Sequence, residues 1–180
     1  MTASQTLHLN LAEIRAAAPS LRAGMSVRLS GTLYTARDAA HQRLLKRIES
    51  GEPLPFPLEG ATIYYAGPTP TPPGKVIGSC GPTTSARMDA FTPKLLSLGL
   101  AAMIGKGERS DTVCAAIRTY GAVYFCAVGG AGALISKSVQ SVEEIAFPDL
   151  GCESVKRLTV ENFPAVVAID SLGNNVFRRA

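Results

Sequence analysis

The sequence predicts a mixed α/β fold with a central, mainly parallel sheet and a second, antiparallel sheet. Strand-like and helix-like segments alternate through the middle of the chain, whereas both ends are rich in strand-like runs that favour antiparallel pairing. The composition is that of a packed globular protein, because 46% of the 180 residues are hydrophobic and 18% are charged. We therefore expect one compact domain over residues 1–180.

The strands are predicted from alternating polarity or from short apolar runs that end in turn residues. These segments are residues 5–10, 26–36, 61–67, 76–81, 100–105, 122–130, 142–147 and 154–170. Gly31 lies inside the second of them and predicts a kink in that strand.

The helices are predicted where a start or stop signal accompanies the apolar pattern, at residues 11–18, 37–51, 92–99 and 110–120. Asn10 and Ser110 are suited to cap two of these helices, and Gly51 is suited to end another. The proline-rich segments 52–60 and 68–75 predict surface loops.

Several classes of protein are disfavoured by the sequence. Apolar runs such as residues 98–104 contain glycine and fall far short of the roughly 20 residues that span a membrane. The first ten residues lack the basic and apolar regions of a signal peptide, so we expect a cytoplasmic protein without a membrane segment. The four cysteines form no C-x-x-C pair, and we expect reduced thiols and no metal site in this chain.

The net charge of +4 indicates an anionic partner. No basic cluster is interleaved with aromatic residues, and Arg178 and Arg179 form only a two-residue basic tail. We therefore expect a small anionic substrate rather than nucleic acid.

The stretch SCGPTTSARMDAF, residues 79–91, is the first candidate for an anion site. It is expected to follow a buried strand and precede a helix, where backbone amides and the helix dipole favour negative charge. Thr83, Thr84 and Ser85 add hydroxyl groups, and Arg87 adds a planar fork that fits a carboxylate. Capping of the helix would explain one hydroxyl, but it does not explain three together with an arginine.

Lys106 lies between glycines in the second candidate loop, IGKGERS, and the Walker A spacing is absent from it. Taken alone, this loop is typical of a solvent-facing turn. In a parallel sheet, however, loops that follow strands gather at one edge, which would bring Lys106 beside Arg87.

Arg37 begins a predicted helix, where a cation is unfavourable for the helix dipole. A residue that breaks a local rule is a candidate for function. His41 lies one turn after Arg37 and Asp38, and we interpret it as a histidine that packs or caps. The glycine-rich segment 129–134 lacks the dinucleotide-binding spacing, and we interpret it as a tight turn against a partner surface.

Two arginines, one lysine and several hydroxyls at strand ends suit a dicarboxylate. The sequence contains no obvious metal set, paired carboxylates or catalytic triad. The protein therefore either only binds its ligand, or the chemistry depends on another chain.

Six segments together resemble the β subunit, or C-terminal domain, of the iron–sulfur-dependent class I fumarases and L(+)-tartrate dehydratases. They are LSGTLYTARDAAHQR, YYAGPTP, IGSCGPTTSARMD, IGKGERS, VGGAGALISKSV and FPDLGCESVKRLTVENFPAVVAIDSLGNN. Each is weak alone, but they occur in the family's order and extend from about Leu21 to the end of the chain.

The resemblance implies a swivelling β/β/α fold of three layers and a heteromeric hydro-lyase, such as an α2β2 assembly. It implies that the partner α subunit binds a [4Fe–4S] cluster through three cysteines of its own, and that the fourth iron acts as a Lewis acid. This chain would bind no cluster. Alone it would be inactive, and its exposed face around the strand ends would dock the α subunit.

The resemblance also implies the site residues: Arg37, Thr83, Thr84, Ser85, Ala86, Arg87 and Lys106 would bind the substrate. Thr83 would be the catalytic base that takes the C3 proton of malate. Asp38, His41 and Gly107 are candidates for supporting roles. Fumarate and malate are the expected substrates, L(+)-tartrate is the alternative, and a stand-alone dicarboxylate-binding module is the rival of another class.

Overall fold

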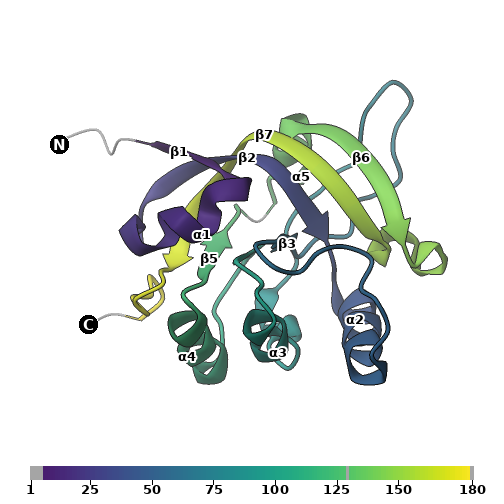
Figure 1. Cartoon of the computed structure of the whole chain (residues 1–180). Helices are drawn as coiled ribbons and strands as arrows, with labels where there is room; N and C mark the ends of the chain where they lie inside the picture. Colours follow the sequence, from purple (N-terminus) through teal and green to yellow (C-terminus); the bar gives the residue numbers. More distant parts are fainter. Residues whose placement is uncertain (1–5, 129, 179–180) are drawn as a thin grey trace.

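A computed structural model describes residues 6–128 and 130–178 and shows a mixed α/β fold around one seven-stranded sheet (Figure 1). Its strands are β1 (Leu7–Asn10), β2 (Ser26–Thr35), β3 (Thr62–Tyr64), β4 (Ala102–Gly105), β5 (Val123–Cys126), β6 (Val139–Ala146) and β7 (Val155–Ile169). The mixed α/β class predicted from the alternation of segments is therefore confirmed.

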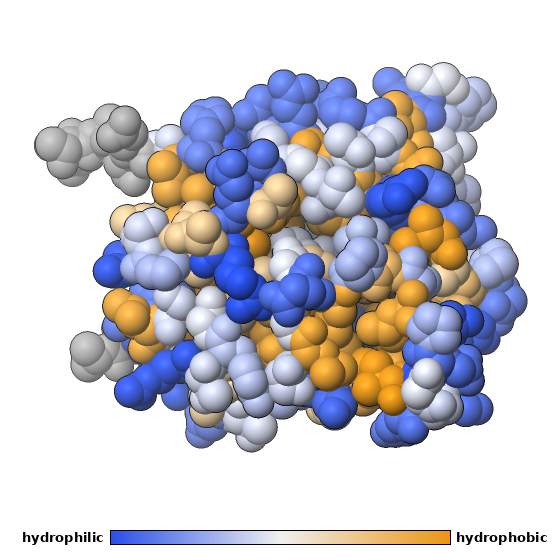
Figure 2. All heavy atoms as spheres, in the orientation of Figure 1, coloured by the Kyte–Doolittle hydropathy of each residue, from blue (hydrophilic) through white to orange (hydrophobic). Residues whose placement is uncertain are grey.

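The helices of the described residues contribute to two separate hydrophobic cores. They are α1 (Ile14–Ala17), α2 (Asp38–Ser50), α3 (Thr92–Ser97), α4 (Asp111–Tyr120) and α5 (Gly132–Ile135), with short 3₁₀ segments η1 (Leu11–Glu13), η2 (Ala18–Ser20), η3 (Ser85–Met88), η4 (Ser136–Ser138) and η5 (Pro148–Glu153). Helices α1 and α5 contribute to one core, and α2, α3 and α4 contribute to the other. In Figure 1, α2, α3 and α4 line the lower side of the molecule, while β2, β7 and β6 arch over the upper side. Figure 2 shows apolar side chains gathered in the region of α2 and α3.

The sheet combines parallel and antiparallel pairing. Strands β1 to β5 pair in parallel in chain order, and β7 runs antiparallel to β2, β5 and β6. Because β7 pairs with both β2 and β5, the pairings β2–β3–β4–β5–β7 close into a ring. The antiparallel strands thus continue the same hydrogen-bonded sheet, which differs from the expected second sheet.

The middle strands separate two hydrophobic cores. Tyr64 of β3 and Phe125 of β5 belong to one core, whereas Ile63 and Tyr124 belong to the other core, which includes residues of α2, α3 and α4. Successive strand residues point to opposite faces, so a strand that is covered on both faces must be apolar throughout. Strands β3 and β4 lie between the two cores and are accordingly buried along their whole length.

The local signals read from the sequence are confirmed at the helix ends. Asn10 Oδ1 accepts a hydrogen bond from the backbone amide of Ala12 at 3.0 Å, and Ser110 Oγ accepts one from Val113 at 3.4 Å. Gly51 ends α2 in the left-handed conformation with φ of 70°. The kink expected at Gly31 is present as a shift in the β2–β7 register.

The predicted strand at residues 76–81 is wrong. Val76 is 50% exposed, and the segment pairs with no strand. It is fixed instead by local bonds, since Ser79 and Thr69 exchange hydrogen bonds and the amide of Cys80 donates to the carbonyl oxygen of Gly132 at 3.2 Å. A short apolar run therefore packs here as a loop.

The segment 130–138 contains α5 and η4 where a tight turn was expected. Gly129 of that predicted turn lies outside the described residues. Within residues 6–128 and 130–178, every helix is too short or too polar to cross a lipid bilayer.

Candidate active site

Three segments of the predicted site meet at one edge of the sheet. Arg37 follows the end of β2, and Lys106 follows the end of β4. The amide of Thr83 donates to the carbonyl oxygen of Tyr65, just beyond β3, at 2.7 Å. Strands β2, β3 and β4 are parallel neighbours, so their carboxyl ends place these segments side by side.

Arg87 links the hydroxyl-rich stretch, residues 79–91, to the start of α2. Its Nε and Nη2 donate to the two carboxylate oxygens of Asp38 at 2.9 and 2.7 Å, and its Nη1 donates to Thr83 Oγ1 at 3.1 Å. A guanidinium carries five N–H groups. These contacts use three and leave two, one on each Nη, for another oxygen.

Arg37 lies between two carboxylates. Its Nη2 is 3.5 Å from Glu153 Oε1, and its Nε is 3.7 Å from Asp38 Oδ2. The buried Nε has no hydrogen-bond partner among the described residues. Gly67 packs closely, since an added Cβ there would lie 3.0 Å from the Cδ and Nη1 of Arg37. The Arg37 side chain is 21% exposed, so these neighbours partly shield it from solvent and fix its orientation.

Ser85 fastens the hydroxyl-rich stretch to the loop after β4. Its amide donates to the carbonyl oxygen of Lys106, and the amide of Lys106 donates to Ser85 Oγ, each at 3.0 Å. Tyr124 Oη also lies 2.8 Å from Ser85 Oγ and 2.8 Å from the carbonyl oxygen of Gly107. Ser85 is fully buried, so it positions this loop and does not face an anion as expected.

The other residues of the stretch differ in exposure, and Met88 is fully buried. Thr84 and Ala86 are exposed, and Thr84 forms a parallel bridge with Lys106. The expected helix dipole is absent here, because Ser85–Met88 is a single 3₁₀ turn and α3 begins only at Thr92. The positive character of the site therefore comes from its arginine and lysine side chains.

Comparison with known proteins matches all 180 residues to the family model described as "Fumarase C-terminus". The chain belongs to the Fumarase C-terminus family. It is 41% identical over 158 residues to fumarate hydratase 2 of Leishmania major, which covers 87% of this chain and 28% of that protein.

Two further relatives of this Fumarase C-terminus chain are named as subunits. The putative L(+)-tartrate dehydratase subunit beta of Methanocaldococcus jannaschii is 41% identical over 163 residues, which cover 87% of this chain and 84% of that subunit. The L(+)-tartrate dehydratase subunit beta of Escherichia coli is 34% identical over 161 residues, which cover 87% and 79%. The family domain thus occurs within longer proteins and as a separate subunit.

In this Fumarase C-terminus domain His41 lies in the core beneath Arg37. Its Nδ1 is 2.9 Å from the carbonyl oxygen of Arg37, and its ring packs against Tyr65 and Phe91 with centroid distances of 5.4 and 5.7 Å. Its Nε2 is buried without a partner among the described residues. Burial lowers the pKa of His41 from 6.5 to about 4. These contacts support the packing interpretation of His41.

The stability of the domain should fall in acid because of His41. The unfolded chain takes up a proton on this ring near pH 6.5, whereas the folded chain does so only near pH 4. His41 therefore leaves the free energy of unfolding unchanged above pH 6.5. As the pH falls from 6.5 toward 4, this residue lowers the free energy of unfolding by about 3 kcal/mol in total. Urea unfolding of wild type and His41→Gln across this range should show a smaller acid loss in the variant. Parallel curves would contradict this assignment.

Two charged residues near the site were not predicted from the sequence. Glu153 Oε2 accepts a hydrogen bond from the amide of Ala39 at 3.0 Å, and Glu153 also faces Arg37. Arg109 is buried between the rings of Tyr65 and Tyr124 and donates to Asp89 at 2.6 Å. No spacing signal links Glu153 to Ala39 across 114 residues, and the only local signal is the cation Arg37 at a helix start, where an acid is favoured.

Replacement of Glu153 should separate its two contacts. Glu153→Ala removes the acceptor for the first turn of α2 as well as the partner of Arg37, and should lower the free energy of unfolding by about 1 kcal/mol. Glu153→Gln keeps an acceptor and removes the charge, so it should cost less. Urea unfolding of both variants measures the difference. Equal stability of Glu153→Ala and wild type would show that the cap contributes nothing.

The cysteines offer no ligand set for a metal cluster in the part of the chain that the structure describes. No three histidine, cysteine or acidic side chains gather there. Burial raises the pKa of the Cys80 thiol to about 12, so this group is a poor thiolate ligand. The residues present therefore do not fit a [4Fe–4S] cluster.

Proposed function

We propose that this chain is the β subunit of a heteromeric [4Fe–4S] hydro-lyase that interconverts fumarate and L-malate. The observation that carries the proposal is the joined arrangement of Thr83, Arg87, Asp38 and Arg37 beside the loop of Lys106. Membership of the Fumarase C-terminus family, and relatives named as fumarate hydratases, support it. The chain spans 28% of the length of these fumarate hydratases, and in this proposal a partner polypeptide supplies the counterpart of the rest.

The cations would bind and orient the two substrate carboxylates. Arg87 has two unused N–H groups, and the Arg37 side chain, although partly shielded, is still 21% exposed. Together with Lys106, they would also stabilise the extra negative charge that develops when a proton leaves the carbon next to a carboxylate. Asp38 and Glu153 fix the directions of the two guanidinium groups.

Thr83 would move the proton at C3 of malate and return it to fumarate during hydration. A threonine hydroxyl needs a cationic neighbour to act as a base, and Arg87 Nη1 donates to Thr83 Oγ1 at 3.1 Å. Thr84 is exposed and has no such donor among the described contacts. This difference supports Thr83, rather than Thr84, as the residue that holds the proton.

The [4Fe–4S] cluster would be held by the partner α subunit, because the described residues of this chain do not fit it. We further propose an α2β2 assembly in the cytoplasm and a swivelling, three-layer β/β/α arrangement. The two separate cores on either side of β3, β4 and β5 support the layered arrangement.

A second candidate function is L(+)-tartrate dehydration. It is favoured by the match in size, because this chain covers 84% and 79% of two proteins named as tartrate dehydratase β subunits. The same cations would bind tartrate, which differs from malate by one hydroxyl.

The test is anaerobic co-expression with the α subunit of the same organism, followed by assays with fumarate, L-malate and both tartrate enantiomers. We expect turnover of fumarate and malate by the complex and none by either chain alone. Turnover of L(+)-tartrate alone would select the second candidate. Tight malate binding by the isolated chain, without turnover in the complex, would instead indicate a stand-alone binding module.

A further inference from the structure

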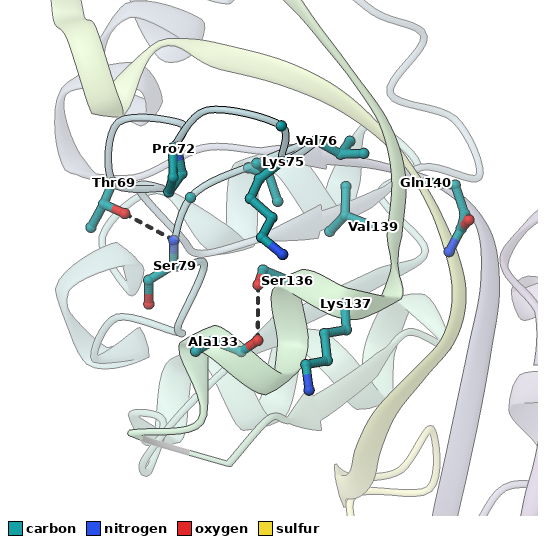
Figure 3. Close-up of a pocket in the computed structure, with 13 residues that line it drawn as sticks. Thr69, Pro72, Lys75, Val76, Ser79, Ala133, Ser136, Lys137, Val139 and Gln140 are labelled. Carbon is teal, nitrogen blue, oxygen red and sulfur yellow. Dashed lines mark hydrogen bonds between the residues drawn. The ribbon is translucent and has the colours of Figure 1, made fainter.

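A cleft of about 730 Å³ lies between the proline-rich loop and the α5–η4 segment. Figure 3 shows Lys75 on the loop wall and Lys137 on the opposite wall, with Ser136 between them, and Val139 also lines the cleft. The candidate active-site residues do not line it. It is therefore a separate feature of the surface that the proposed function has not used.

Hydrogen bonds and close packing hold the proline-rich loop that forms one wall of the cleft. At its base, the Ser79 amide donates to Thr69 Oγ1 at 2.8 Å, and the Thr69 amide donates to the Ser79 carbonyl oxygen at 3.0 Å (Figure 3). Gly78 permits this closure, since an added Cβ would lie 2.2 Å from the carbonyl oxygen of Thr69. Gly132 lets α5 approach, since its Cβ would lie 2.4 Å from Ser79 Oγ. A fixed loop with an exposed tip is suited to recognition.

Exposed apolar side chains lie in the cleft and next to it. Val76, which lines the cleft, is 50% exposed, and Leu134 on α5, next to the cleft residue Ala133, is 60% exposed. Beyond α5, a second hollow of about 410 Å³ is lined by Leu134, Val128 and Lys137, and Val128 is 64% exposed. Apolar side chains of this size on both sides of α5 fit a macromolecular partner better than a small polar ligand.

The charge of the cleft is positive. Its lining residues include Lys75 and Lys137 and no carboxylate. Neither lysine forms an ion pair with any residue that the structure describes. An occupant with carboxylates would therefore gain two charge pairs without displacing any that exist.

The cleft also lies close to the candidate active site. Thr69 lines both the cleft and a neighbouring hollow that Cys152 helps to form. Cys152 precedes Glu153, which faces Arg37, and a Cβ added to Gly67 would lie 3.0 Å from Arg37 and 3.2 Å from the carbonyl oxygen of Cys152. A chain that covered the active site would lie within reach of the cleft.

We propose that this cleft docks an acidic, partly apolar segment of the partner polypeptide, the one that corresponds to the part of the fumarate hydratases that this chain does not cover. Its carboxylates pair with Lys75 and Lys137, and its apolar side chains cover Val76 and Leu134. This inference rests on the proposed function for the existence of that partner. It adds which surface holds the partner and by what chemistry.

The test compares two double charge reversals in binding to the purified α subunit under anaerobic conditions. Lys75→Glu/Lys137→Glu should raise the dissociation constant at least 10-fold and should weaken its dependence on salt concentration. Lys46→Glu/Lys94→Glu is the matched control, because these exposed lysines lie on α2 and α3 and the net charge change is the same. The control should bind like wild type. Equal binding by both double variants and wild type would overturn the proposal.

Hydrogen exchange on the wild-type complex gives a second readout that needs no variant. Backbone amides in residues 69–79 and 132–140 should exchange more slowly with the α subunit bound. Unchanged exchange there in a saturated complex would overturn the proposal, even if a charge-reversed chain failed to fold. Protection of this cleft in a complex that turns over neither fumarate nor tartrate would overturn the proposed reaction and leave the docking site standing.

Discussion

Replacement of Thr83 with alanine is expected to lower the turnover number of the assembled complex by about 10²–10⁴-fold, the range for loss of a positioned acid–base group. The change removes the hydroxyl to which Arg87 Nη1 donates at 3.1 Å. The half-buried Thr83 holds the loop through its backbone amide, so folding and partner binding should persist. Steady-state assays of fumarate hydration with the reconstituted complex measure the loss.

Two companion variants sharpen this test. Thr83→Ser keeps an Oγ in place and should retain much of the activity. Thr84→Ala removes an exposed neighbouring hydroxyl and should have a far smaller effect than Thr83→Ala. Substantial residual turnover in Thr83→Ala, at normal complex assembly, would remove Thr83 from the proton transfer.

Arg87→Lys should lower kcat/KM by about 10²–10³-fold, similar to the loss of one donor that stabilises a developing anion. A lysine cannot pair with both Asp38 oxygens and Thr83 Oγ1 while presenting further N–H groups to the substrate. The same assays, together with urea unfolding, separate the catalytic loss from a stability change. A kcat/KM within a few-fold of wild type would show that Arg87 makes no two-point contact with the substrate.

Asp38→Asn is the matched control for Arg87. It keeps the size of the side chain but removes the charge that holds Arg87 in its orientation. If Asp38 only orients Arg87, the variant should raise KM more than it lowers kcat. A fall in kcat as large as that of Arg87→Lys would assign Asp38 a direct part in the reaction.

Much of the fold was predictable from local patterns. The alternation of β2 and the apolar runs of β4 and β5 depend on which faces are buried, and that information lies within each segment. The pairing of β7 with both β2 and β5 depends on contacts far apart in the chain, which no local pattern contains. Residues 76–81 show that a local pattern can also mislead. Their apolar run predicts a strand, but it packs as a loop held by hydrogen bonds to Thr69 and Gly132.

The sequence pointed to segments that the structure brings together, but not to the detailed arrangement of their side chains. Arg37 was singled out as a cation at a helix start, and Glu153, far along the chain, supplies a second negative charge beside it in addition to Asp38. Sequence spacing gives no indication of which hydroxyls of a loop face inward. Ser85 is fully buried under Lys106 and Tyr124, while Thr84 is exposed, although the two are neighbours.

The most direct test of the central claim is an anaerobic crystal structure of the α–β complex with L-malate bound. The account predicts that the malate carboxylates lie within hydrogen-bonding distance of Arg37, Arg87 and Lys106, and that C3 lies beside Thr83 Oγ1. Malate held entirely by residues of the partner subunit, with Thr83 and Arg87 out of contact, would contradict it.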